Sequence, residues 1–306
     1  MKFYIYAPSY NENSGGCVVL HKLVHIINEE TEHTADLVPH ILEQFRLGGL
    51  RTLASNAYAY LALRKNKFFF NRNSSFNTPV KTNVTEDELK DSIVVYPEIT
   101  FGNPLGAKNV VRWFLHQPGH FTGEVCYGTG ELYFKFNSMI RSFDLYKSKL
   151  SKSELKVIHY PTEIYNTDSV IKERKGDCYM IRKGGHKAKV HDDTAICLDG
   201  LSHTEISEIF KKSKRFISYD DYTAYSIFAI LSGCESVVVP DVNISKQQWY
   251  PLESDRYGIA YGFSEDEKVW ANSTKNKVLE HVESEHQRSV SNVKKFVEES
   301  IEYFNE

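Results

Sequence analysis

Short apolar runs alternate with longer amphipathic stretches in the first half of the chain. Five runs have the length and composition of buried strands, and they span residues 2–7, 36–39, 92–96, 109–115 and 132–136. Between the first two runs, residues 17–28 place apolar side chains on a broad helical face. Strands separated by helical stretches predict a mostly parallel sheet.

The same alternation begins again after a polar stretch at residues 162–175, which we interpret as a linker. Four further runs predict strands at residues 178–181, 194–198, 215–218 and 236–240. Ser202 and Glu205 have the spacing of a capping box and predict a helix that runs to Lys212. A second, buried helix is expected from Thr223 to Ser232, and residues 275–304 predict one or two amphipathic helices.

This order of elements predicts an α/β protein with two Rossmann-like domains, whose mostly parallel sheets face each other across a cleft. The expected domains are residues 1–160 and 161–275, with residues 276–306 as C-terminal helices that pack across both. A length of 306 residues agrees with two domains.

Composition narrows the range of functions. The formal net charge is -3, so the chain lacks the basic surplus of a protein that binds nucleic acid through phosphate contacts. We find neither the apolar region of an export signal nor a run of about 18 apolar residues, and we expect a cytoplasmic protein. The five cysteines have no zinc-ligand spacing and are expected to be reduced, buried thiols.

A glycine loop follows the first predicted strand. Ser14, Gly15 and Gly16 lead directly into the first helix. Glycines at such a place let the backbone approach a ligand, and the amino end of a helix favours an anion. A tight strand-to-helix turn explains the glycines equally well. The carboxyl ends of parallel strands border the ligand crevice, and this position favours a binding role for Gly15 and Gly16.

A basic loop occupies the corresponding place in the second half. Arg182, Lys183 and Lys187 surround two glycines directly after a predicted strand. Fixed cations at this position could stabilise the charge of a departing nucleoside diphosphate without a metal ion. A solvated basic loop is the alternative.

A polar turn, Ser218 to Thr223, ends the third strand of the second half. Backbone amides at Asp221 and Tyr222, together with the Thr223 hydroxyl, could hold a phosphate where the next helix begins. Asp221 is also well placed as the N-cap of that helix.

The segment from Gly200 to Asp241 resembles the donor-binding half of GT-B glycosyltransferases, among them bacterial polysaccharide and lipopolysaccharide enzymes. The resemblance implies that Arg182 and Lys183, or Lys187, contact the donor phosphates. Many of these enzymes carry two glutamates eight positions apart in this region, and the corresponding places here hold Asp220 and Phe228. The second carboxylate is therefore missing, so a retaining or inverting outcome stays open.

Three residues at strand ends in the first half are candidates for the catalytic base. Glu98 follows one strand, and His116 and His120 follow the next. Any of them could accept the proton of an acceptor hydroxyl in an inverting displacement. A turn cap for Glu98 and a structural role for each histidine are the alternatives.

The sequence thus predicts a glycosyltransferase that uses a UDP-, GDP- or dTDP-linked sugar, with a glycan or lipid-linked acceptor in cell-surface polysaccharide synthesis. We expect no cofactor and no metal site, because the Asp-x-Asp pattern of metal-dependent glycosyltransferases is absent from the sequence. Peripheral association with the inner face of the membrane stays open. The alternatives are a sugar-nucleotide epimerase of the same fold and a non-catalytic glycosyltransferase-like binding protein.

Overall fold

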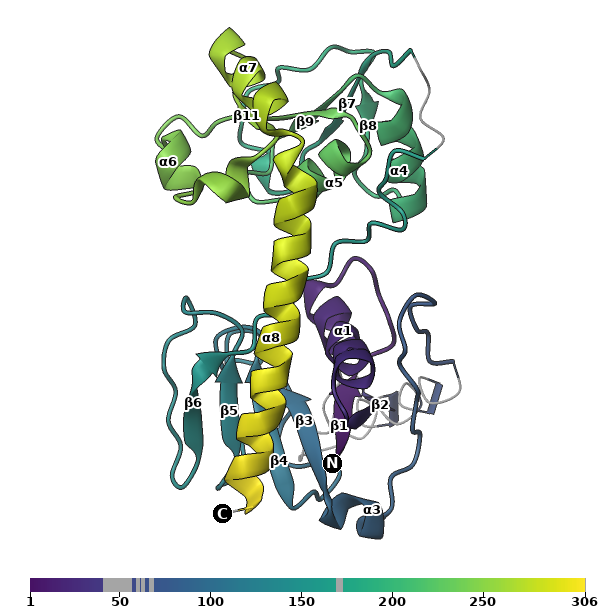
Figure 1. Ribbon diagram of the computed structural model, residues 1–306, viewed down its shortest axis with the longest axis vertical. Helices are drawn as coiled ribbons and strands as arrows, with labels where there is room; N and C mark the ends of the chain where they lie inside the picture. The colour runs from purple at the N-terminus through teal and green to yellow at the C-terminus, as the bar shows by residue number, and fades with distance from the viewer. Residues whose placement is uncertain (41–56, 59–60, 62–63, 66–68, 169–172, 306) are drawn as a thin grey trace. The chain divides into compact units, whose positions relative to one another are not determined.

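The computed structural model describes residues 1–40, 57–58, 61, 64–65, 69–168 and 173–305. The chain divides into two compact units (Figure 1). Unit 1 contains Met1–His159 and His286–Glu306, and unit 2 contains Tyr160–Glu285. Residues 169–172 of the predicted linker lie outside the described residues.

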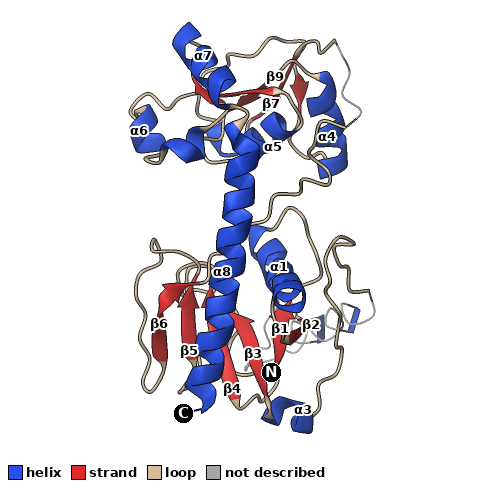
Figure 2. Cartoon of the chain, in the orientation of Figure 1, coloured by secondary structure: helices blue, strands red, loops and turns tan. Residues whose placement is uncertain are grey.

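Unit 1 is built on a six-stranded sheet in the order β2-β1-β3-β4-β5-β6, and each neighbouring pair is parallel (Figure 2). The strands are β1 (Lys2–Ala7), β2 (Thr34–Pro39), β3 (Ser92–Pro97), β4 (Asn109–Phe114), β5 (Leu132–Lys135) and β6 (Lys149–Glu154). The helices are α1 (Gly15–Glu30), α3 (Glu86–Lys90) and the second part of α8 (Lys277–Asn305). Strand β6 was not predicted from the sequence.

The strands of this sheet do not need to alternate apolar and polar residues, because both faces of the sheet are covered. Phe3 and Ile5 of β1 pack on one face with apolar residues of α1 and with Phe296 of α8. Tyr4 and Tyr6 point to the opposite face and pack in a separate apolar cluster. This two-residue period explains why β1 reads as a continuous apolar run.

Unit 2 contains a five-stranded parallel sheet in the order β11-β10-β9-β7-β8. Its strands are β7 (Asp177–Met180), β8 (Ile196–Cys197), β9 (Arg215–Ser218), β10 (Glu235–Val238) and β11 (Ile259–Tyr261). Its helices are α4 (His203–Lys212), α5 (Tyr225–Leu231), α6 (Lys246–Trp249), α7 (Glu265–Thr274) and the first part of α8, with 3₁₀ helices η1 (Arg182–Gly184) and η2 (Glu253–Arg256). The expected capping box at α4 is confirmed, because Ser202 and Glu205 exchange their side-chain hydrogen bonds.

Two local predictions in unit 2 were wrong. Helix α5 begins at Tyr225 rather than Thr223, and its N-cap residue, Ala224, offers no side-chain hydrogen bond. The predicted linker also contributes to a core: Tyr165 is 1% exposed and stacks on Phe228 with ring centroids 4.4 Å apart. The adjacent Ile164 packs against the same core. Most other residues of the segment are polar, which is why it was interpreted as a linker.

Each sheet reverses its direction of growth at one place. In unit 1, β2 lies on one side of β1, and the next strand of the sheet in sequence, β3, lies on the other side of β1. In unit 2, β8 and β9 flank β7 in the same way. Ligands of open parallel sheets bind outside the carboxyl ends of the strands at such a switch point. The expected α/β class with two Rossmann-like, mostly parallel sheets is confirmed.

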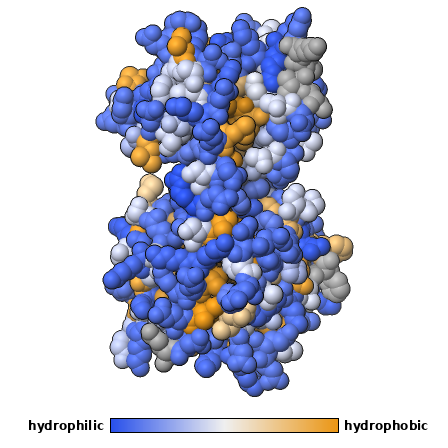
Figure 3. Space-filling model, in the orientation of Figure 1, coloured by the Kyte–Doolittle hydropathy of each residue, from blue (hydrophilic) through white to orange (hydrophobic). Residues whose placement is uncertain are grey.

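Polar and charged side chains predominate on the face that Figure 3 shows. Among the described residues, no helix has both the length and the apolar character needed to cross a membrane.

Candidate functional site

The switch point of unit 2 lies between the carboxyl ends of β7 and β9. Strand β7 leads directly into η1, which contains Arg182 and Lys183, and β9 leads into the turn that contains Asp221 to Thr223. The two segments are in contact, because the amide of Tyr219 donates a hydrogen bond to the carbonyl of Met180 at 3.0 Å. The basic loop and the polar turn are therefore neighbours in space.

Arg182 is held in an uncommon backbone conformation. Its φ angle is 41°, in the left-handed region that residues other than glycine seldom adopt. The carboxylate of Asp199 accepts hydrogen bonds from the backbone amides of Ile181 at 2.7 Å and of Arg182 at 3.2 Å. The exposed guanidinium group lies 5.5 Å from the centre of the Tyr225 ring. Backbone strain of this kind is found most often at binding and catalytic sites.

Gly184 is required by the close packing of η1 against Tyr219, the residue that follows β9. A Cβ atom at this position would lie 2.0 Å from the carbonyl oxygen of Tyr219, so no larger residue fits without movement of the backbone. At Gly185 the nearest atom would be a methyl group of Ile181, at an ordinary 3.8 Å. One of the two glycines in the basic loop therefore has a structural reason, and it fixes the position of Arg182 and Lys183.

Lys187, one of the predicted phosphate ligands, forms an ion pair within the protein. Its Nζ atom lies 2.6 Å from Oδ1 of Asp221 and donates a hydrogen bond to the carbonyl of Val239 at 2.7 Å. The side chains of Lys187 and Asp221 are only 5% and 16% exposed. The alternative role of Asp221 as an N-cap was wrong, since its carboxylate binds Lys187. The ion pair thus connects the basic loop with the segments that follow β9 and β10.

The rest of the polar turn is only partly available to a ligand. Tyr222 is 58% exposed, whereas the buried Thr223 uses its hydroxyl to accept a hydrogen bond from the amide of Tyr225 at 3.4 Å. Helix α5 has seven residues, which is short for a helix whose dipole is to bind an anion. Phe228, in the place of the missing carboxylate, is buried in the core of unit 2. Of this turn, Tyr222 is the side chain most accessible to a ligand.

The switch point of unit 1 lies between β1 and β3, and Glu98 follows β3 at the carboxyl edge of the sheet, where it contacts residues that follow β4. This side chain is 5% exposed, and its Oε2 atom accepts a hydrogen bond from the amide of Leu115 at 3.0 Å. Burial raises the pKa of Glu98 to about 7, although hydrogen bonds from the backbone at Leu115 and His116 oppose the rise. A carboxyl group with a pKa near neutrality can both accept and release a proton under physiological conditions.

His116 and His120 lie at the end of the next strand, β4. Their ring centroids are 4.0 Å apart. Burial lowers the pKa of His116, and the neighbouring His120 lowers it further. His116 is half-buried next to the backbone that binds Glu98, while His120 is exposed and packs against Phe121. The structure therefore brings Glu98 closer to His116 than a spacing of 18 residues in the sequence would indicate.

Gly15 and Gly16 form the first turn of α1, at the same edge of the sheet. Ser14 is the N-cap, and its hydroxyl accepts a hydrogen bond from the amide of Cys17. A Cβ atom at Gly15 would meet no described atom within 4 Å, and one at Gly16 would lie 3.5 Å from a methyl group of Leu115. The fold therefore does not require either glycine. Leu115 connects this turn with Glu98, because it contacts both.

Asp199 and Tyr225 are two components of the unit 2 site that the sequence analysis missed. Asp199 follows β8, and Tyr225 is the first residue of α5. The signal for Asp199 was present, since an aspartate followed by Gly200 ends the strand that was predicted over residues 194–198. Within the described residues, no group of three or more His, Cys, Asp or Glu side chains has the arrangement of a metal site.

Comparisons with known proteins do not assign the chain to a family. No protein-family model matches the chain, and a search of curated proteins finds no match.

Proposed function

We propose that this protein is a glycosyltransferase that moves a sugar from a nucleotide-sugar donor to a glycan or lipid-linked acceptor. The observation that carries the proposal is the conformation of Arg182. Its backbone is strained, the Asp199 carboxylate and the Tyr225 ring hold it in place, and its guanidinium group remains exposed at a switch point. A guanidinium group that is already ordered can bind a diphosphate with little further loss of conformational entropy.

The donor diphosphate is assigned to Arg182 and Lys183 in this proposal. Negative charge develops on the diphosphate as its bond to the sugar breaks, and two adjacent cations stabilise that charge more strongly than they stabilise the bound donor. We assign no direct contact to Lys187, because Asp221 neutralises it. Cationic side chains supply this stabilisation without the need for a metal ion or a cofactor.

The acceptor hydroxyl is assigned to the switch point of unit 1. Glu98 is the favoured base, because its pKa of about 7 lets it take a proton from the hydroxyl near neutral pH. His116 is the alternative base. Gly15 leaves open space in which an acceptor or donor group can approach the backbone, and the neighbouring Gly16 packs beside Leu115.

We infer a cytoplasmic location from the chain's five free cysteines. Cys17, Cys178 and Cys234 are buried as expected, whereas Cys126 and Cys197 are exposed, so the expectation of a buried thiol was wrong for these two. A lipid-linked acceptor would bring the protein to the inner face of the membrane. Synthesis of a cell-surface polysaccharide is the process that would consume such a product.

Calorimetric titration with UDP, GDP and dTDP tests the diphosphate assignment. Arg182→Ala should weaken binding of the preferred nucleotide by about 1.5–3 kcal/mol, which corresponds to roughly tenfold to 150-fold. Lys212→Ala is the matched control, because Lys212 is an exposed cation on α4 of the same unit. Unchanged affinity in Arg182→Ala, or no binding of any nucleotide by the unmodified protein, would refute the proposal.

A second measurement separates the transferase from an epimerase. Incubation with the preferred nucleotide sugar alone should leave the sugar configuration unchanged, and release of the nucleoside diphosphate should increase when an acceptor is added. Conversion of the donor to an isomer without an acceptor would identify an epimerase.

A further inference from the structure

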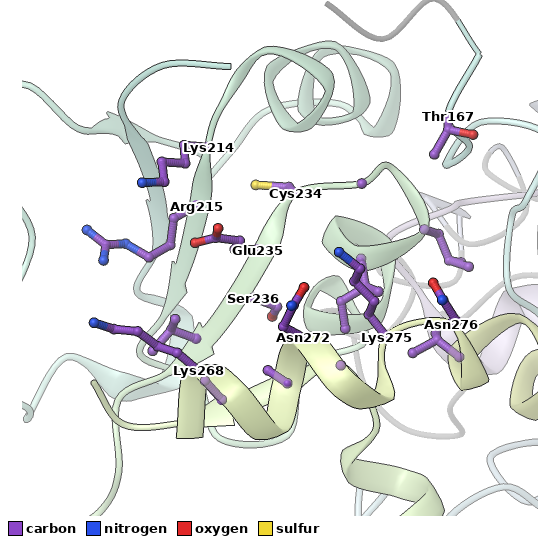
Figure 4. Close-up of a pocket in the computed structure, with 18 of the residues that line it drawn as sticks. Thr167, Lys214, Arg215, Cys234, Glu235, Ser236, Lys268, Asn272, Lys275 and Asn276 are labelled. Atoms are coloured by element: carbon purple, nitrogen blue, oxygen red, sulfur yellow. The ribbon is translucent and has the colours of Figure 1, made fainter. Parts of the chain in front are cut away.

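A hollow of about 920 Å³ lies at the edge of the unit 2 sheet opposite to the basic loop. Its lining includes residues at the amino ends of β9 and β10, such as Arg215 and Glu235, and residues of α7 (Figure 4). Its volume is in the range of sites for small molecules. Because Arg182 and Lys183 follow the carboxyl end of β7, this hollow is distinct from the proposed donor site.

The charged ends of Lys214, Arg215 and Lys268 gather along one side of the hollow (Figure 4). Asp177 holds the guanidinium group of Arg215 at 2.5 Å, and Glu265 lies 3.1 Å from Lys268. Cations outnumber carboxylates in the whole lining. The cations are Arg174, Lys214, Arg215, Lys268 and Lys275, and the carboxylates are Glu235 and Glu265. This local surplus contrasts with the net charge of -3 of the chain, and it favours an anionic ligand.

Arg174 removes an obstacle to anion binding at this edge. The carboxyl ends of helices carry partial negative charge, and in a parallel α/β unit they lie near the amino ends of the strands. Arg174 donates hydrogen bonds to the carbonyl of Ser232, which caps α5, at 2.7 Å and to that of Phe210 in α4 at 3.3 Å. Gly233 makes this possible, since a Cβ atom there would lie 2.5 Å from a guanidinium nitrogen of Arg174.

Two polar groups in the wall of the hollow have unused hydrogen-bonding capacity. Ser236 is 2% exposed, and among the described residues its hydroxyl has no hydrogen-bond partner; the same holds for Nε of Arg215. A buried polar group without a partner is destabilising, so such groups are usually satisfied by a ligand or by water. Asn272 of α7 also lines the hollow (Figure 4).

We propose that this hollow binds a small phosphate monoester. Asp177 and Glu265 offset part of the charge of Arg215 and Lys268, and Lys214 adds a further cation beside them. The remaining positive surplus suits a phosphate, which has several acceptor oxygens and about two charges. The ester body would lie toward Ser236 and Asn272, with Val269 and Leu279 as apolar parts of the lining. The site is independent of the proposed glycosyltransferase activity, since it shares no residue with the donor site.

Calorimetric titrations of the full chain with glycerol 3-phosphate, hexyl phosphate and inorganic phosphate test this proposal. At least one ester should bind more tightly than inorganic phosphate. Preference for glycerol 3-phosphate would indicate a hydroxylated body, and preference for hexyl phosphate an apolar one. Absence of saturable binding, or equal affinity for all three probes, would overturn the proposal.

Variants place the binding in the hollow. The double variant Lys214→Ala/Lys268→Ala should weaken binding of the preferred ester about tenfold or more. Ser236→Ala should weaken it about threefold if the hydroxyl meets the ester body. Lys212→Ala and Arg182→Ala should leave it unchanged. Loss of ester binding in Arg182→Ala would show that the probes occupy the nucleotide site, and the proposal would then be wrong.

Discussion

The carboxylate of Asp199 accepts a hydrogen bond from the backbone amide of Arg182, and so holds a residue whose φ angle is 41°. Asp199 and Arg182 are 17 residues apart in the sequence. They meet because β7 and β8 are neighbours in the sheet, so that both strands end at the same edge. Asp199 is therefore a positioning residue, which acts on a ligand through Arg182.

Asp199→Ala should weaken nucleoside diphosphate binding without any loss of a ligand contact. Without the carboxylate, Arg182 can leave its strained conformation, and the ordering of its side chain must then be paid for on binding. We expect a reduction of about threefold to tenfold in affinity by calorimetry. Asp192→Ala is the control, because Asp192 is also exposed and accepts a backbone hydrogen bond, from Thr194. Equal affinities in the Asp199 and Asp192 variants would argue against a positioning role.

Substitution of Lys187 should affect stability much more than nucleotide binding. Lys187→Met removes one partner of a mostly buried ion pair and leaves the Asp221 carboxylate 16% exposed without its cation. We expect a loss of about 3 kcal/mol in the free energy of unfolding, at the lower end of the range for such changes. Urea denaturation measures this loss, and the double variant Lys187→Met/Asp221→Asn should recover part of it. A stable Lys187→Met protein that no longer binds nucleotide would restore the phosphate contact predicted from the sequence.

The sequence could predict most strands because burial on both faces produces continuous apolar runs, as in β1 and β3. It could not predict β6, whose residues Lys149–Glu154 are mostly polar because this edge strand is only partly buried. The location of Arg182 at the carboxyl edge of the sheet could be predicted, because Arg182 comes directly after a predicted strand. The partners of Lys187 could not be predicted, because Asp221 lies 34 residues further along the chain. Contacts of this kind depend on strand order, which the pattern of one sequence does not contain.

Alanine at Gly15 or Gly16 should stabilise the fold. Both residues belong to α1 and neither needs a positive φ angle or close packing, so each substitution should add about 0.5 kcal/mol to the free energy of unfolding. Gly106→Ala is a matched contrast, because its Cβ would also meet open space but its φ angle is 68°; it should cost about 1–2 kcal/mol.

Function should respond in the opposite direction if the glycine turn of α1 admits a ligand. Gly15→Ala and Gly16→Ala should then lower the rate of sugar transfer while they raise stability in urea. A more stable variant with an unchanged rate would show that the glycines form a turn only.

Glu98 should make the stability of the protein depend on pH in a distinctive direction. In the folded protein burial raises the pKa of Glu98 to about 7, from an ordinary value of 4.5. Between these two values the folded protein retains a proton that the unfolded chain has released, so the free energy of unfolding falls as the pH rises. The stabilising contribution is complete below the lower value and is lost as the pH rises through about 7.

Comparison with Glu98→Gln isolates this effect, because glutamine does not titrate and its side-chain oxygen can still accept the hydrogen bond from Leu115. The difference in unfolding free energy between the unmodified protein and the variant should decrease by up to about 3 kcal/mol from acid to weakly alkaline pH. A difference that does not vary with pH would mean that Glu98 ionises normally. Glu98 could then not act as a base with a pKa near 7. A carboxylate with an ordinary, lower pKa is too weak a base for this step.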